Sequence, residues 1–353
     1  MKKLLSLILC CLILVPIVHI RSGAVYAAAT TSEILMETSS GRVLYENNAD
    51  EARPMASTTK ILTALIAAEC CNPDDVVTIP KSCVGVEGSS VYLEEGEKLT
   101  VKELLYGLML RSGNDCAEAL ACHISGSVAQ FAERMNQRAV ELGAEHSHFT
   151  NPHGLPDDDH YTTARDLAKI AAFALGNPLF KEVVSTRRAE ISWASHEYNR
   201  VLINKNKMLN ELEGATGIKT GYTKKAGRCL VTSCERNGME LVCVVLNCGP
   251  MFERSKELLN SAFSGYQLTT VYRSSDIIDF IPVEGDDEPC GIYIKNDIRL
   301  PLTTEERKTL KIVYDYPDQL VPPFKKDHQI GEMKIYASNK LIFSEKIYTI
   351  IGK

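Results

Sequence analysis

Ser57-Thr58-Thr59-Lys60, followed by the almost wholly apolar run from Ile61 to Ala68, is the stretch that decides the fold and points to the chemistry of this chain. Residues three apart lie on one face of a helix, so the Lys60 amine is predicted to stand beside the Ser57 hydroxyl. A serine becomes a nucleophile only with a nearby base. Burial and the positive end of a helix dipole both disfavour the ammonium form, so Lys60 is predicted to act as that base.

A structural interpretation of the same four residues has to be weighed against this one. A serine before an apolar helix commonly caps it, and a lysine one turn later commonly extends to solvent. The apolar character of Ile61 to Ala68 on all sides favours a helix that is buried all round. We therefore expect Lys60 to be shielded from water.

A second segment supplies polar groups at a turn between two helices. Thr100 to Glu103 forms a capping-box pattern before the helix-like run Leu104 to Leu110, and this run stops at Ser112-Gly113-Asn114. A further helical stretch begins at Asp115. At this turn Ser112 is expected to exchange protons with Lys60, and the Asn114 amide to bind a substrate amide. The alternative is a simple helix cap, since Ser-Gly-Asn turns are common.

The third segment, Lys219-Thr220-Gly221, is predicted to lie on a strand. The runs Cys229 to Cys234 and Met239 to Asn247 read as two strands joined by a tight turn at Asn237-Gly238. Lys219 and Thr220 offer a cation and a hydroxyl for a carboxylate-bearing substrate, and Gly221 permits close backbone approach by a ligand. Taken alone, the segment would be an ordinary surface strand.

These three segments together resemble the Ser-x-x-Lys, Ser-Asp-Asn and Lys-Thr-Gly set of penicillin-binding proteins and class A β-lactamases, with Gly113 in place of the aspartate. Three further stretches are similar to the low-molecular-weight D-alanyl-D-alanine carboxypeptidases. They are Asn151-Pro152-His153-Gly154-Leu155, Tyr161-Thr162-Thr163-Ala164-Arg165-Asp166 and Gly217-Ile218-Lys219-Thr220-Gly221-Tyr222-Thr223.

The resemblance implies a serine-type carboxypeptidase that removes the terminal D-alanine of peptidoglycan stem peptides, is inhibited covalently by β-lactam antibiotics and needs no cofactor or metal. It implies the following roles: Ser57 as acyl-enzyme nucleophile, Lys60 as base, Ser112 as proton relay, Asn114 as a contact to the peptide, Lys219 and Thr220 as carboxylate ligands, and the backbone N–H groups of Ser57 and Tyr222 as the oxyanion hole. In Asn204-Lys205-Asn206, a segment similar to one that often carries arginine, Lys205 is expected to alter carboxylate binding.

Two other functions fit parts of the pattern. A β-lactamase-like serine hydrolase would need a second base, usually a glutamate, and residues 151–165 supply none. A non-catalytic cell-wall-binding protein would keep the fold and lose the chemistry, whereas all three motifs are present here.

Length, charge and the N-terminus indicate where such an enzyme works. The chain has 353 residues and a formal net charge of −6, which argues against a nucleic-acid partner. Lys2 and Lys3 precede the apolar stretch Leu4 to Ile20, so residues 1–29 are predicted to be a signal peptide, with an uncleaved membrane anchor as the alternative. The protein is therefore expected to be exported, to the cell wall or the outer face of the cytoplasmic membrane. Peripheral membrane association stays open.

The order of the elements predicts an α+β fold. Residues 30–265 are expected to form a catalytic domain in which one antiparallel sheet is covered by helices, because a hairpin before residue 47 and the later hairpin flank a helical middle. Residues 272–353 are expected to form a small all-β domain that serves as a structural spacer. Its predicted strands are 277–283, 291–294, 298–302, 310–314, 332–336 and 341–350.

Cysteines and histidines do not indicate a metal site. Twelve cysteines occur without a Cys-x-x-Cys pair, and the hairpin register places Cys234 opposite Leu241 and Cys243 opposite Thr232. We expect mostly free, buried thiols. The histidines at positions 146, 148, 153 and 160, near the aspartates at 157–159, are interpreted as solvated loop residues rather than metal ligands.

Overall fold

The computed structural model describes residues 30–194 and 196–353. The predicted signal peptide 1–29 and its alternative, a membrane anchor, lie outside the described residues. Within the described part of the chain, no helix has both the length and the apolar character needed to cross a bilayer.

A five-stranded antiparallel sheet forms the framework of the first part of the chain, in the order β2-β1-β9-β8-β7. Its strands are β1 (Ser32–Glu37), β2 (Val43–Asn47), β7 (Ala215–Thr223), β8 (Gly227–Arg236) and β9 (Met239–Leu246). The turn at Asn237 and Gly238 has positive φ values of 53° and 74°, as a type I′ turn requires. Cys234 pairs with Leu241 and Thr232 with Cys243, which confirms the predicted register.

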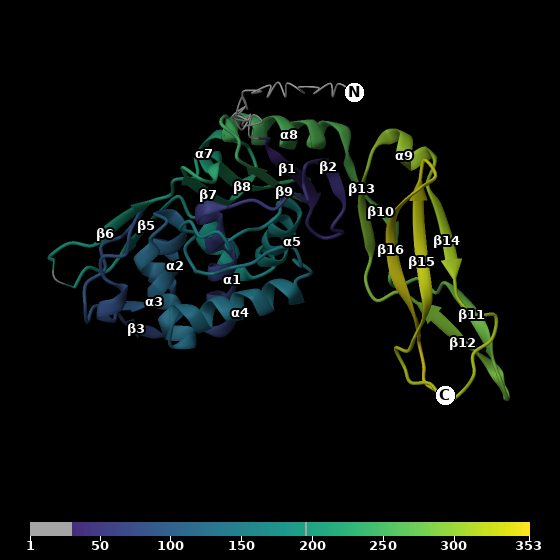
Figure 1. Cartoon of the computed structure of the whole chain (residues 1–353). Coiled ribbons are helices and arrows are strands. Elements are labelled where there is room, and N and C mark those ends of the chain that lie inside the picture. The colour runs from purple at the N-terminus through teal and green to yellow at the C-terminus, as the bar shows by residue number, and fades with distance from the viewer. Residues whose placement is uncertain (1–29, 195) are drawn as a thin grey trace, which may run out of the picture. The chain divides into compact units, whose positions relative to one another are not determined.

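Both faces of this sheet are covered by helices, as Figure 1 shows. Alternate residues of β8 point to opposite sides, so that Leu230 packs with helix α8 (Met251–Gly265) and Val231 packs with the helices of the other face. The helices that pack against the other face are α5 (Ala164–Leu175) and α6 (Pro178–Ser185). An antiparallel sheet covered by helices was predicted, and the α+β class is confirmed.

Some of the predicted helices begin directly after a residue whose side chain caps them. In α2 (Val101–Leu110) the side chains of Thr100 and Glu103 form a complete capping box. The other predicted helices are α1 (Lys60–Cys70), α3 (Asn114–Ser125) and α4 (Val128–Glu141), together with α5 and α8. Helix α1 is buried on nearly every side from Lys60 to Ala67, as its apolar sequence predicted.

Several short elements were not predicted. They are η1 (Ala56–Thr59), η2 (Lys81–Cys83), β3 (Val76–Thr78), β4 (Lys98–Thr100), α6, β5 (Arg188–Ile191), β6 (Arg200–Ile203) and α7 (Met208–Glu211). Helix α6 did carry a signal, because the Asn177 side chain caps it and Pro178 occupies its first turn. The others span three or four residues, too few to show a periodic pattern.

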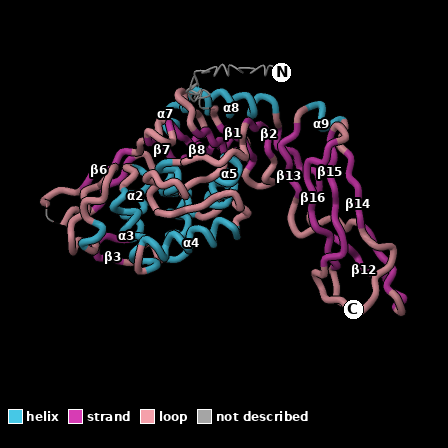
Figure 2. The backbone as a smooth tube through the Cα atoms, viewed as in Figure 1, coloured by secondary structure: helices cyan, strands magenta, loops and turns pink. Residues whose placement is uncertain are grey.

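The C-terminal part is built of strands, seen as magenta tube in Figure 2. The five-stranded sheet β11-β12-β16-β15-β14 contains Asp279–Val283, Asp286–Tyr293, Lys340–Thr349, Gln329–Ala337 and Lys311–Asp315, in that order, and β10 (Gln267–Tyr272) pairs with β13 (Ile298–Leu302). All six predicted strands are present, β13 with the predicted bounds and the other five with shifted ends. Strand β10 lies largely in the stretch 266–271, which neither predicted domain included. The five-residue helix α9 (Thr304–Lys308), with a Thr303–Glu306 capping box, was not expected.

Candidate active site

Ser57 and Lys60 lie together where η1 passes into α1. Lys60 is fully buried, and its Nζ is 3.3 Å from Ser57 Oγ. Neither η1 nor α1 begins with a side-chain cap, so the interpretation of Ser57 as a helix cap is wrong. Burial of the Lys60 amine likewise excludes its extension to solvent. The predicted pairing of a serine hydroxyl with a buried lysine amine is confirmed.

The Lys60 amine has two further partners, which come from distant parts of the chain. Lys60 Nζ donates to Asn114 Oδ1 at 2.7 Å and to the backbone oxygen of His153 at 2.6 Å. Two oxygen acceptors therefore fix the position of the amine. Its third hydrogen-bond partner is the Ser57 hydroxyl.

Burial and neighbouring charge both act against protonation of this amine. Burial holds the pKa of Lys60 well below its usual value, and the nearby charge of Lys219 lowers it further. Lys219 is itself buried, and burial lowers its pKa to about 7, with the charge of Lys205 as the second cause. Lys219 and Lys205 thus disfavour the ammonium form of Lys60, and Lys205 disfavours that of Lys219.

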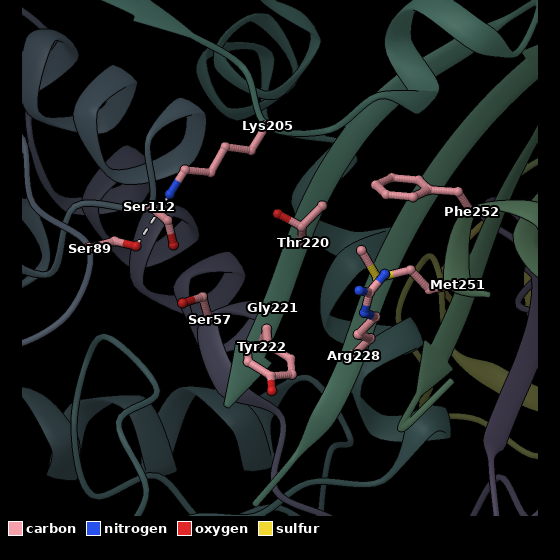
Figure 3. A pocket seen from close by; sticks show the side chains of 10 residues that line it. All are labelled: Ser57, Ser89, Ser112, Lys205, Thr220, Gly221, Tyr222, Arg228, Met251 and Phe252. Atoms are coloured by element: carbon pink, nitrogen blue, oxygen red, sulfur yellow. Dashed lines mark hydrogen bonds between the residues drawn. The ribbon is translucent and has the colours of Figure 1, made fainter. Parts of the chain in front are cut away.

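A cavity of about 480 Å³ opens beside Ser57. Figure 3 shows Lys205 reaching toward Ser89 and Ser112 on one side of this cavity, with Thr220 facing them from strand β7. Lys205 Nζ lies 3.2 Å from Ser89 Oγ. The cavity is lined by Ser57, Ser89, Ser112, Lys205, Thr220, Gly221, Tyr222, Arg228, Met251 and Phe252. All three sequence motifs therefore contribute side chains to one cavity.

Two of the predicted substrate-binding residues lie behind the cavity wall instead of lining it. Asn114 is 4% exposed, and both ends of its amide are engaged, since Nδ2 donates to the backbone oxygen of Glu87 at 2.5 Å. Lys219 is 1% exposed, and its Nζ donates to the backbone oxygen of Thr220 at 3.0 Å. The cationic side chains that do line the cavity are Lys205 and Arg228.

The backbone around Gly221 packs closely against the segment that carries Ser57. A Cβ atom at position 221 would lie 3.1 Å from both Ser57 N and Met55 O. The chain's own packing thus disfavours a side chain at this position, whereas the sequence had suggested approach by a ligand. Ser112 reaches the cavity through a left-handed backbone conformation, with a φ of 66°.

The sequence did not identify His153 as a partner of Lys60. Gly154, with a φ of 89°, lies against η1 so tightly that a Cβ there would come within 1.9 Å of Ala56 O. This contact brings the preceding carbonyl, that of His153, to the Lys60 amine. The His153 ring is held by the backbone N–H of Leu155, which donates to Nδ1 at 3.2 Å. The sequence feature that could have indicated this contact is a histidine followed by a glycine in a loop that also contains Pro152 and Pro156.

The interpretation of the histidines as solvated loop residues is wrong for two of the four. His153 and His160 are 6% and 3% exposed, and burial lowers their pKa values to about 3 and about 4. His160 Nε2 lies 2.8 Å from Thr59 Oγ1, so this ring supports η1. Within residues 30–194 and 196–353, no group of three or more histidine, cysteine or acidic side chains is arranged to hold a metal ion.

Fold and site together define a class: serine enzymes of the penicillin-binding type, in which a serine and a lysine at the start of a buried helix face a sheet strand across a cavity. The profile of the D-alanyl-D-alanine carboxypeptidase family matches residues 20–249, and that of the penicillin-binding protein 5 C-terminal domain matches residues 266–350. The chain belongs to the D-alanyl-D-alanine carboxypeptidase family.

Individual proteins are similar to this one over most of its length. It is 30% identical to the D-alanyl-D-alanine carboxypeptidase DacF of Bacillus subtilis, covering 88% of this chain and 82% of the relative. It is 37% identical to a D-alanyl-D-alanine carboxypeptidase of a Streptomyces species, covering 64% and 85%. Penicillin-binding protein 5 from Haemophilus influenzae superposes with a TM-score of 0.81 at 28% identity, covering 91% of this chain and 96% of that structure.

Proposed function

We propose that this protein is an exported carboxypeptidase that cleaves the terminal D-alanine from peptidoglycan stem peptides through an acyl-enzyme on Ser57. The observation that carries the proposal is the environment of the Lys60 amine. A neutral amine has two N–H groups and one lone pair. Asn114 Oδ1 and the His153 carbonyl accept the two N–H groups, so the lone pair is left for the Ser57 hydroxyl proton.

In the proposed reaction Ser57 Oγ attacks the carbonyl carbon of the peptide bond while Lys60 takes its proton. The negative charge that develops on the carbonyl oxygen is stabilised by the backbone N–H groups of Ser57 and Tyr222. Ser112 lines the same cavity and passes the proton to the departing amine of D-alanine. Water then hydrolyses the acyl-enzyme.

The terminal carboxylate of the substrate is proposed to meet Thr220 and Lys205. Both side chains line the cavity, and both can donate hydrogen bonds to a carboxylate. The buried Lys219 adds positive charge from behind Thr220, and a bound carboxylate would favour its protonated form. We assign to Asn114 the role of holding the Lys60 amine in place. The sequence had instead led us to expect a contact between Asn114 and the substrate peptide.

The parts of the chain have separate proposed roles. Residues 1–29 direct export, so that the enzyme meets peptidoglycan outside the cytoplasm. Residues 30–265 form the catalytic part, and the β-rich part that follows, 272–353, serves as a spacer. β-Lactam antibiotics are proposed to acylate Ser57 in place of the substrate.

Labelled penicillin tests the proposal directly. The purified protein should take up one covalent label, mapped by peptide mass spectrometry to Ser57, and should release D-alanine from a peptide that ends in D-Ala-D-Ala. Ser57→Ala should do neither, while Ser264→Ala, an exposed serine at the end of α8, should do both. Label on Ser57→Ala would refute the nucleophile, and rapid turnover of the label would favour a β-lactamase.

A further inference from the structure

Cys83 and Cys122 bring two thiols together outside the catalytic cavity. Cys83 ends the short helix η2 and is fully buried, while Cys122 lies on α3 and is half-buried. Their Sγ atoms are 3.8 Å apart, with the Cys83 thiol donating to Cys122. A disulfide needs a sulfur–sulfur distance of about 2.0 Å, so the two sulfur atoms would have to approach each other by about 1.8 Å to be joined.

Cys122 is accessible to small molecules. A cavity of about 280 Å³ lies over this part of α3, and Ser82, Cys122, His123 and Gly126 contribute to its walls. The catalytic cavity has none of these residues in its lining. A reagent can therefore meet Cys122 without entering the site of peptide hydrolysis.

The two cysteines belong to segments that meet a second time at the catalytic site. The chain leaving η2 passes through Glu87 and Ser89, whose backbone oxygens accept hydrogen bonds from Nδ2 and N of Asn114 at 2.5 and 2.7 Å. Asn114 begins α3, and Cys122 lies two turns later on the same helix. Segment 84–91 is thus held to α3 at its catalytic end by hydrogen bonds, and the thiol pair lies at its other end.

We propose that Cys83 and Cys122 form a reversible disulfide that fastens segment 84–91 to helix α3 when the protein meets a low-molecular-weight disulfide oxidant outside the cytoplasm. The inference goes beyond the proposed peptidase activity and does not depend on it. The ring closed by the bond would contain Ser89, Ser112 and Asn114. Cross-linking restricts the unfolded chain, so the oxidised protein should be the more stable form.

The chemistry is two thiol–disulfide exchanges. Cys122 loses its proton, and its sulfur attacks one sulfur of the oxidant. The first thiolate of the oxidant leaves and takes up that proton. Cys83 then loses its proton and attacks the Cys122 sulfur, which releases the second half of the oxidant as a thiol. The two protein thiols lose two electrons, and the oxidant gains them.

The order of attack follows from the surroundings of the two sulfurs. Burial raises the pKa of Cys83 to about 12, with the neighbouring Cys122 as the second cause. Cys83 therefore stays protonated until the exchange has begun. Cys122 borders the cavity and is the thiol that meets the oxidant.

The test equilibrates the purified full-length protein in glutathione redox buffers, alkylates the free thiols and maps the peptides by mass spectrometry. We expect a cross-linked peptide pair joining Cys83 to Cys122, and a melting temperature about 5 °C higher for the oxidised form. Cys122→Ala and Cys83→Ala should each lose the cross-link and the shift. Cys290→Ala, a buried cysteine of the C-terminal part, should keep both.

Two results would overturn the proposal. One is glutathione that stays on Cys122 as a mixed disulfide without cross-linking. The other is an equal melting shift in Cys122→Ala, a half-buried position whose replacement is expected to fold. Penicillin should label Ser57 in both redox forms, so a failure of the cross-link is distinguishable from a failure of the peptidase proposal.

Discussion

The catalytic part and the C-terminal part of this protein bury different kinds of groups. Among the described residues, buried polar or charged side chains are frequent before residue 256, and Thr349 is the one that follows. The C-terminal core is instead built from residues such as Ile292, Met333, Ile335 and Ile347. Burying a charge costs free energy unless it is compensated. The comparison teaches that the catalytic part accepts this cost behind the cavity wall, at Lys60 and Lys219, and also away from the cavity lining, as in the ion pair of Arg200 with Glu97.

Replacing the proposed nucleophile should have the largest effect. Ser57→Ala should lose covalent penicillin labelling and at least about a thousandfold in peptide hydrolysis, because Ser57 supplies the hydroxyl held beside the Lys60 amine, whose other two partners are an amide oxygen and a backbone oxygen. Its free energy of unfolding should change little. Release of D-alanine and denaturant unfolding measure the two quantities. A variant that still hydrolysed the peptide at a comparable rate would place the chemistry elsewhere.

Replacing the proposed base should affect activity more than stability. Lys60→Met should slow acylation by roughly 10²- to 10⁴-fold, since the serine loses its proton acceptor. The same change removes a buried amine, so the unfolding free energy should not fall as far as an ordinary core substitution would lower it. Lys308→Met, an exposed lysine of α9, is the control and should alter neither quantity. Equal acylation rates in the two variants would contradict the role of Lys60.

The buried Lys219 should make stability depend on pH. Its pKa is about 7 in the folded protein and near 10.5 when unfolded. Between these values the unfolded chain binds more protons, so this lysine makes stability rise with pH. Relative to Lys219→Met, wild type should gain roughly 2 kcal/mol between pH 7 and pH 9. Buried thiols with raised pKa values act in the opposite direction in both proteins, so the difference between them isolates Lys219. If the unfolding free energies of wild type and Lys219→Met changed with pH in parallel, that result would contradict this account.

A cavity in the C-terminal core should have the smallest effect on catalysis. Ile335→Ala removes a fully buried side chain and should cost about 2–5 kcal/mol in the stability of that part. The acylation rate by penicillin should stay within about twofold of wild type, because the cavity beside Ser57 is lined by earlier residues. Stopped-flow labelling with penicillin, at a temperature below the unfolding transition, measures this acylation rate. A tenfold loss would show that the two parts are coupled.

The sequence predicted those features that depend on local pattern. The apolar run after Lys60 predicted burial, and the Thr100–Glu103 capping box and the Asn237-Gly238 turn fixed where a helix and a hairpin begin. Burial of Lys60 follows from its place in the helix. These features need no knowledge of distant residues.

Contacts between distant segments could not be predicted in the same way. The His153 carbonyl reaches Lys60 because Gly154 packs on η1, 98 residues from Ala56 along the chain (154 − 56). Asn114 turned out to bind Lys60, since the turn before α3 places its amide behind the cavity wall. A polar residue's type shows which bonds it can make, and only the packing decides which partner it meets.

The most direct test of the central claim is the titration of the Lys60 amine in the intact protein, followed by NMR with isotope-labelled lysine and assigned with Lys60→Met. The account predicts an amine that titrates well below the usual lysine value of 10.5, in step with the rise of penicillin acylation with pH. An amine that stays protonated up to that usual value while Ser57 is acylated at full rate would contradict it.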